Sequence, residues 1–202
     1  MWKSPVAQFL AVLVAILLFV SLGPEEKSLG SNVRIVYLHG AWVLTALAAF
    51  LVSGGTGLAA LFTRRERYHY LSRTLGYTGL VFWVTYLPLS LWAMQANWNG
   101  LFLAEPRMRT AFVFAVTGLL LQAGLALLDR PALVSAANVA YIAVLLFVLS
   151  RVDSVMHPPP SPIFNSGNAL LQFYFIALNL LTWAAALQVA RWLHGCGTKA
   201  AV

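Results

Sequence analysis

The sequence predicts an all-α, polytopic membrane protein, and three observations lead to that fold class. The mean hydropathy is +0.78, only 9% of the residues are charged, and long apolar runs recur with the charges between them. An apolar run of about 20 residues crosses a hydrocarbon core of about 30 Å as one α-helix. We find six such runs, at residues 5–23, 38–62, 75–96, 108–128, 132–152 and 167–193. They use most of the chain, so we expect residues 1–202 to form one six-helix transmembrane domain.

The distribution of cations predicts the orientation in the membrane. If the N-terminus lies inside, more Lys and Arg residues fall in cytoplasmic segments than in outer segments. The cytoplasmic cations are Lys3, Arg64, Arg65, Arg67, Arg73, Arg130, Arg191 and Lys199, and the outer ones are Lys27, Arg34, Arg107, Arg109 and Arg151. The positive-inside rule therefore predicts that both termini are cytoplasmic. The first apolar run lacks a small-x-small cleavage site, so we expect it to remain as the first helix.

Charge and cysteine content argue against several classes of function. The net charge of +7 is accounted for by membrane topology, and we expect no nucleic-acid binding. The single cysteine, Cys196, cannot form an intramolecular disulfide or a Cys-x-x-Cys redox pair. No Asp, Glu or Lys lies in the middle of a predicted span, which argues against a proton relay or an ion-coupled transporter.

Two of the four histidines fall on the predicted outer side. His39 begins the second helix in "RIVYLHGAW", and His157 lies in the outer loop at residues 152–166, in "MHPPPS". The three prolines after His157 cannot continue a helix and favour a stiff, extended backbone. His69 and His194 fall in basic cytoplasmic segments, where we expect interfacial residues without a special role.

An aromatic outer loop, residues 92–110, lies between these two histidines in the sequence. It contains Trp98 and Phe102 and ends with Arg107 and Arg109. Two imidazoles can supply both axial ligands of a haem iron, and arginines can pair with the propionates. A zinc site is less well supported, because two histidines without an outer cysteine are an incomplete ligand set. A structural role for each histidine taken alone remains an open alternative.

Three local motifs resemble the CcmC-type haem-handling proteins of cytochrome c maturation, the CcmC/CcsA-like family with a tryptophan-rich WWD segment. "RIVYLHGAW" is similar to the family's R-I-M-Y-V-H-x-x-A-A-W, and this places the first family haem ligand on His39. "MHPPPS" is similar to L-H-Q-P-A-S, and this places the second ligand on His157. "WNGLFLAEPRM" is similar to W-G-T-W-W-V-W-D-A-R-L, in which Trp98 matches the first Trp, Glu105 stands for the Asp and Arg107 matches the Arg.

The chain resembles a divergent member of this family, with a degenerate WWD segment. Of the four tryptophans in the segment only Trp98 is present, and Leu101, Phe102 and Ala104 stand at the other positions. A Phe or Leu side chain has no indole N–H to donate. We therefore expect a thinner aromatic shelf than the family has.

The resemblance implies haem binding and delivery at the outer face of the bacterial cytoplasmic (inner) membrane during cytochrome c biogenesis. Haem b would be ligated by His39 and His157 and released to a partner, and no bond-making reaction is assigned to the chain. In the family the partner is an ABC-type maturation complex or a haem chaperone. The implied contact residues are Trp42, Trp98 and Phe102 for the porphyrin, and Arg107, Arg34 and Arg109 for the propionates.

The alternative function is that of a non-catalytic, CcmC-like subunit in a larger membrane assembly for electron transfer. Such a subunit would be structural or would hold haem permanently. The degenerate WWD segment favours this alternative, because that segment serves haem transfer in the family.

Small and amide residues inside the predicted spans indicate close helix packing. The glycines in "LVSGGTGLAAL" permit close contact between helices in lipid. Asn138, Asn179 and Gln172 lie in apolar runs, where hydrogen bonds between helices are the expected explanation.

Overall fold

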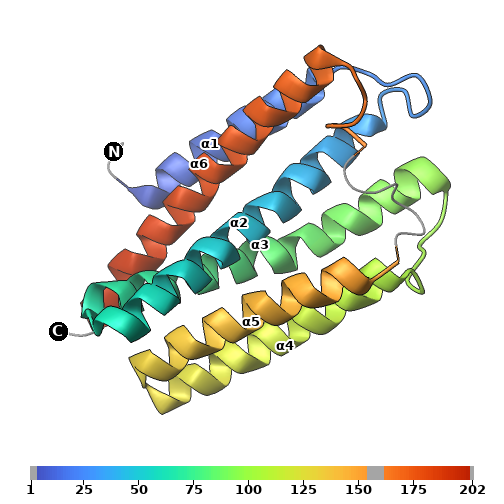
Figure 1. The fold of residues 1–202 in the computed structure, drawn as a ribbon. Helices are drawn as coiled ribbons and strands as arrows, with labels where there is room; N and C mark the ends of the chain where they lie inside the picture. Colours follow the sequence, from blue (N-terminus) through green and yellow to red (C-terminus); the bar gives the residue numbers. More distant parts are fainter. Residues whose placement is uncertain (1–3, 154–161, 201–202) are drawn as a thin grey trace.

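The computed structural model describes residues 4–153 and 162–200, with side chains described as far as residue 195, and this part contains six α-helices and no β-strand. The helices are α1 (Pro5–Ser21), α2 (Val33–Thr63), α3 (Glu66–Trp98), α4 (Pro106–Leu128), α5 (Pro131–Arg151) and α6 (Ala169–Ala200) (Figure 1). Within the described residues, five helices are long and apolar enough to cross a membrane, and α1 is a shorter apolar helix of 17 residues. The chain is thus an all-α, multi-pass membrane protein, as its sequence predicts.

The helices run between two ends of the bundle, which we call the loop end and the terminal end (Figure 1). The loop end carries residues 22–32 between α1 and α2, residues 99–105 between α3 and α4, and the described flanks of the α5–α6 connection. The terminal end carries the start of α1, the end of α6 and the two short turns at 64–65 and 129–130. Arg64 and Asp129 end their helices with a left-handed backbone, which closes a helix C-terminus within one residue.

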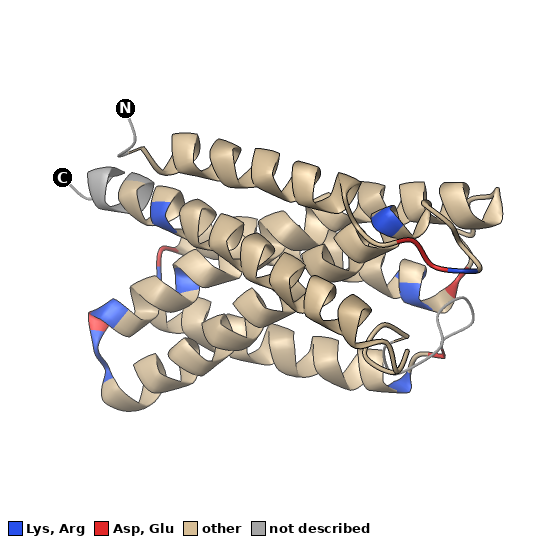
Figure 2. Ribbon diagram, turned by 90° about the horizontal axis from the view of Figure 1, so that it is seen from above, with Lys and Arg blue, Asp and Glu red and all other residues tan. Residues whose placement is uncertain are grey.

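Charged residues gather at these two ends, and the helices between them carry almost none (Figure 2). At the terminal end, Arg73 Nη1 lies 3.6 Å from Asp129 Oδ1 and links α3 to the α4–α5 turn. An ion pair this exposed contributes about 0–1 kcal/mol at most. The separation of charge from the helix centres is what a bilayer requires, because a charge in hydrocarbon is costly.

Helix α2 lies at the centre of the bundle and contacts α1, α3, α5 and α6 (Figure 1). Its inward side chains pack with large buried residues of its neighbours, among them Trp83 on α3 and Phe175 on α6. The outward faces are apolar as well, since Leu127 on α4 and Phe173 on α6 are largely exposed. Such faces are stable in lipid, where the acyl chains are as apolar as the side chains.

Helix α3 begins at Glu66, well before the start predicted at residue 75, so that boundary was wrong. The apolar-run criterion misses the first turns because they carry polar residues, although their backbone remains helical. His69 lies in these turns and is buried, with its Nδ1 2.7 Å from Ser135 Oγ on α5. His69 is thus a buried residue with a partner on α5, and its location at the membrane interface stays a prediction.

Asn138 on α5 forms hydrogen bonds to two neighbouring helices, as its position in an apolar run predicts. Its Nδ2 donates to the backbone oxygen of Ser72 on α3 at 3.0 Å, and its Oδ1 accepts from Gln122 Nε2 on α4 at 2.8 Å. Ser53 Oγ on α2 donates to the same Ser72 oxygen at 2.7 Å. Four helices are thereby joined through polar groups within the membrane-spanning part of the bundle.

Replacing Asn138 by leucine is expected to lower the free energy of unfolding by about 1–2 kcal/mol, because partners on two helices lose their bonds. Asn179 is a matched control, since it is also buried but donates to Phe175 O within its own helix at 2.7 Å. We expect Asn179→Leu to have less than half the effect of Asn138→Leu. Thermal unfolding in one detergent measures both, and equal losses would contradict the bridging role.

Candidate ligand site at the loop end

His39 lies near the start of α2, half-buried at the loop end. Its ring centroid is 5.6 Å from that of Tyr86 on α3, and the two planes are inclined at 44°. The start of α2 is held against the end of α3, because Asn32 Nδ2 donates to Ala96 O at 2.9 Å. Asn97 Nδ2 reaches back to Asn32 O at 3.4 Å. These contacts fix the position of His39 along the axis of α3.

Tyr86 is a residue of this site that sequence reasoning missed. Only 6% of it is exposed, and its ring lies against the His39 ring. The one signal available in the sequence is its place beside Pro88 in "TYLPLS", a polar stretch within an apolar run. That signal does not reveal which helix the ring faces.

Glu105 is a buried carboxylate at the start of α4, with 5% of the residue exposed. It caps the helix, because its Oε2 accepts the Met108 backbone N–H at 2.6 Å, and Pro106 at the first helical position suits this role. Its other oxygen, Oε1, is buried and has no hydrogen-bond partner among the described residues. A buried polar atom without a partner is costly, so Oε1 is positioned to accept a hydrogen bond from a ligand.

Arg107 follows in the first turn of α4 and is half-buried. Its Nε is buried and has no hydrogen-bond partner within the described part of the chain. Arg109, one half-turn further, is exposed. Two guanidinium groups at a helix N-terminus favour an anion, because the helix dipole adds to their positive charge.

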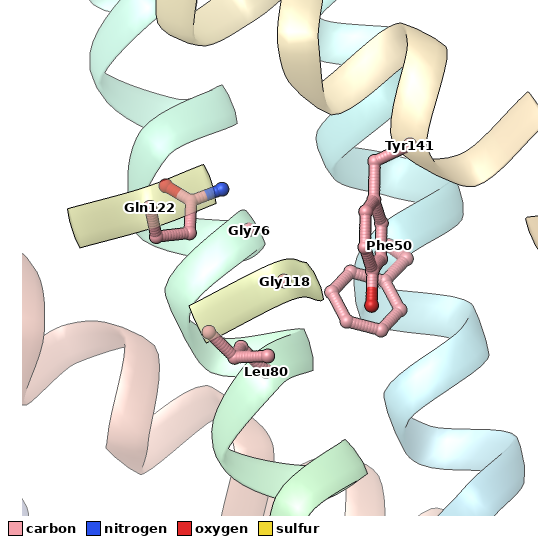
Figure 3. Close-up of a pocket in the computed structure, with 6 residues that line it drawn as sticks. All are labelled: Phe50, Gly76, Leu80, Gly118, Gln122 and Tyr141. Carbon is pink, nitrogen blue, oxygen red and sulfur yellow. The ribbon is translucent and has the colours of Figure 1, made fainter. Parts of the chain in front are cut away.

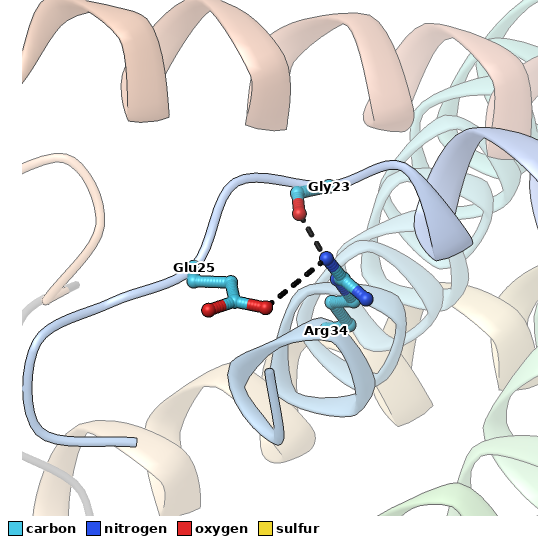
Figure 4. A network of polar contacts seen from close by, with 3 residues as sticks. All are labelled: Gly23, Glu25 and Arg34. Carbon is cyan, nitrogen blue, oxygen red and sulfur yellow. Dashed lines mark hydrogen bonds and ion pairs between the residues drawn. The ribbon is translucent and has the colours of Figure 1, made fainter. Parts of the chain in front are cut away.

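Arg34 is already paired within the loop between α1 and α2 (Figure 4). Its Nε donates to Gly23 O at 3.0 Å, and its Nη2 lies 3.4 Å from Glu25 Oε1. These contacts fasten residues 22–32 to the first turn of α2. A propionate at Arg34 would have to compete with Glu25, so Arg107 is the better placed of the predicted partners.

The predicted aromatic residues divide into two groups. Trp98 ends α3 and Phe102 lies in the following loop, and they are 36% and 41% exposed. Trp42 is instead buried in the contact between α2 and α3, where its Nε1 donates to Thr85 Oγ1 at 2.8 Å. Trp42 therefore serves helix packing, while Trp98 and Phe102 are partly exposed at the loop end.

His157 lies outside the described residues, and its predicted role stays a prediction. The described flanks of its loop, residues 152–153 and 162–168, lie at the loop end with His39. Phe164 in the second flank is 44% exposed and contacts the Phe175 ring edge-on at 5.6 Å. It is a further aromatic residue at this end that sequence reasoning missed. Among the described residues, no three of the types His, Cys, Asp and Glu gather as a metal site.

A cavity within the bundle is too small to be the ligand site (Figure 3). It has a volume of about 10 Å³, whereas pockets for organic ligands measure about 300–1,000 Å³. The residues around it are Phe50, Gly76, Leu80, Gly118, Gln122 and Tyr141. A space of this size accommodates about one water molecule, so the loop end remains the candidate site.

The chain matches no protein-family model, no curated protein sequence and no solved structure. A functional assignment therefore depends on the residues of the loop end and on the resemblance of the three motifs.

Proposed function

We propose that this protein binds haem at the loop end and delivers it during cytochrome c biogenesis. The observation that carries the proposal is that His39 lies at the same end of the bundle as two buried polar atoms without a partner among the described residues, Glu105 Oε1 and Arg107 Nε. A ligand with a metal centre and carboxylate groups would use an imidazole and a guanidinium together. Haem b combines these features, and the motif resemblance points to the same cofactor.

In this proposal His39 and His157 supply the two axial ligands, and Arg107 pairs with a propionate. Haem, when bound, supplies the iron to which the imidazoles bond. Trp98 and Phe102 offer apolar surface to the porphyrin, and the exposed Arg109 adds positive charge at the start of α4 for the second propionate. Tyr86 holds the His39 ring from the buried side through their ring contact.

We propose further that all six helices cross the bacterial cytoplasmic membrane, with both termini inside. Helix α1 spans about 26 Å at 1.5 Å per residue, close to the hydrocarbon thickness of about 30 Å. Exposed leucines such as Leu10 and Leu18 suit a lipid-facing surface on α1. The excess of cations at the terminal end supports a cytoplasmic location of that end and an outer location of the loop end.

An absorption spectrum tests the haem assignment most directly. The full-length protein, purified in mild detergent, is expected to show a Soret band, either as isolated or after addition of haem and removal of unbound haem by gel filtration. Absence of the band after reconstitution would sink the proposal. Haem that is bound but does not pass to an ABC-type maturation complex or a haem chaperone would favour the second function, a membrane subunit that holds haem permanently.

Replacing Arg107 by glutamine is expected to weaken haem binding about tenfold or more, because a charge-assisted bond to a carboxylate contributes about 1.5–3 kcal/mol. Arg151→Gln is the matched control, since Arg151 is an exposed cation at the same end whose guanidinium lies 5.4 Å from the Phe147 ring. Haem titration followed at the Soret band measures both dissociation constants. Equal effects of the two substitutions would mean that the net charge of this end, and not Arg107, attracts haem.

A further inference from the structure

A crevice of about 340 Å³ lies between α3 and α6, with α2 as its floor. Its walls are Ala48 and Ala49 on α2, Leu75 and Thr78 on α3, and Ala186 and Ala190 on α6. The lining is almost wholly apolar, and the crevice belongs to the membrane-spanning part of these helices. It therefore opens to the lipid and is distinct from the loop end.

The dimensions of the crevice select its occupant. The residues of α2 that line the crevice run from Thr45 to Val52, about two helical turns, so a membrane-spanning partner helix would meet the crevice along only a small part of its length. An alkyl chain is much narrower than a helix and can enter. Exposed Val52 and Leu187 at the rim extend the apolar surface on either side.

Charge complementarity decides which lipid fits. One face of α3 carries Leu75, Leu71 and Arg67, because these residues are spaced four apart. This face leads from the crevice toward the terminal end. Leu71 is 40% exposed and Arg67 is exposed, so this strip faces outward with the crevice. Arg64 and Arg65 in the adjoining turn, with Glu66 as the one acid, leave a net positive charge where a lipid headgroup would lie. Such juxtamembrane cation clusters attract anionic lipids.

Contacts between the helices also bound the crevice at its two ends. The Tyr70 ring on α3 meets the His194 ring on α6 edge-on at 6.2 Å. Tyr70 lies about 100° around α3 from Leu71, so this contact lies beside the face that leads to Arg67. On the other side, Thr45 Oγ1 donates to Thr182 Oγ1 at 2.7 Å and closes the floor between α2 and α6. The crevice is thus a bounded recess and not a continuous seam between the helices.

We propose that this crevice binds an acyl chain of an anionic phospholipid, whose headgroup lies at Arg67. The acyl chain would fill the gap that small residues leave between α3 and α6. It is independent of haem, and a protein without haem would bind the lipid equally well.

Photocrosslinking tests the proposal on the full-length protein in phosphatidylcholine nanodiscs that contain phosphatidylglycerol with a diazirine in its acyl chain. Crosslinks mapped by mass spectrometry are expected to concentrate on the crevice residues of α2, α3 and α6. Ala186→Phe and Ala48→Phe, each of which fills the recess, are expected to reduce these crosslinks several-fold. Ala123→Phe, at an exposed position of α4, is the matched control and is expected to leave them unchanged.

The headgroup is tested with Arg67→Gln, which is expected to reduce the preference for phosphatidylglycerol over phosphatidylcholine roughly fivefold, the contribution of one cation near an anionic lipid surface. Arg130→Gln, an exposed cation in the other turn of the same end, is the control. Crosslinks spread evenly around the bundle in the wild type would overturn the site, whatever the variants do. Crosslinks between protein copies at the crevice would show that a second chain covers it and would equally overturn the proposal.

Discussion

Replacing His39 or His157 by alanine is expected to remove most of the Soret absorbance of the haem-loaded protein. Each imidazole supplies one bond to the iron in the proposed complex. Loss of a residue that only orients a metal ligand already costs about 10–100-fold in affinity, so loss of a ligand itself should cost at least as much. Haem titration of each variant, followed by absorbance in the same detergent, measures the change.

A control separates ligation from a structural role of these histidines. His194→Ala alters a histidine at the terminal end and is expected to leave the haem spectrum unchanged. Free imidazole, added to the His39→Ala protein, is expected to restore part of the absorbance by entering the vacated position. If imidazole has no effect and the variant also unfolds at lower temperature, His39 is a packing residue and the proposed ligand set is wrong.

Replacing Gly57 by alanine is expected to lower the free energy of unfolding by about 1–3 kcal/mol. A Cβ atom at this position would lie 2.8 Å from Ser135 O, a backbone atom of α5, and 3.0 Å from Ser72 Oγ on α3. A backbone atom cannot move aside as a flexible side chain can. Helix α2 would therefore have to move away from α5, and the hydrogen bonds around Ser72 would lengthen.

Gly55, two residues away on the same helix, provides the matched control. A Cβ atom there meets nothing within 4 Å among the described atoms, and alanine is favoured over glycine within a helix by about 0.5–1 kcal/mol. Gly55→Ala is thus expected to leave stability unchanged or to raise it. Thermal unfolding, monitored by size exclusion after heating, compares the two variants. A change of stability in the same direction for Gly57→Ala and Gly55→Ala would contradict the close contact at Gly57.

These two glycines also define how far the sequence predicts packing. The glycines of "LVSGGTGLAAL" predicted close helix contact, and this is confirmed at Gly54 and Gly57, where an added Cβ would come within 3 Å of α5. It is wrong at Gly55, whose Cβ direction is open. The sequence contains the residue type, but the rotation of α2 about its axis decides which glycine faces a neighbour.

The candidate site was predictable to a similar extent. Residue type and order placed His39, Glu105 and Arg107 in segments that do lie at one end of the bundle. The sequence could not show that Glu105 turns inward to cap α4, or that Arg34 forms an ion pair with Glu25. Both outcomes depend on short-range geometry at helix starts, where a change of one dihedral angle redirects a charged group.

The sequence by itself determined the all-α membrane fold, because apolar runs of bilayer length allow only helices whose backbone hydrogen bonds are internal. Prolines at the first turns of α1, α4 and α5 also suit the starts of these three helices. Only the tertiary structure decided which polar side chains meet: Asn138 with Gln122, His69 with Ser135, and His39 with Tyr86. The physical reason is that apolar helices attract one another through packing without direction, so their rotation and pairing follow from the sum of many contacts across the bundle.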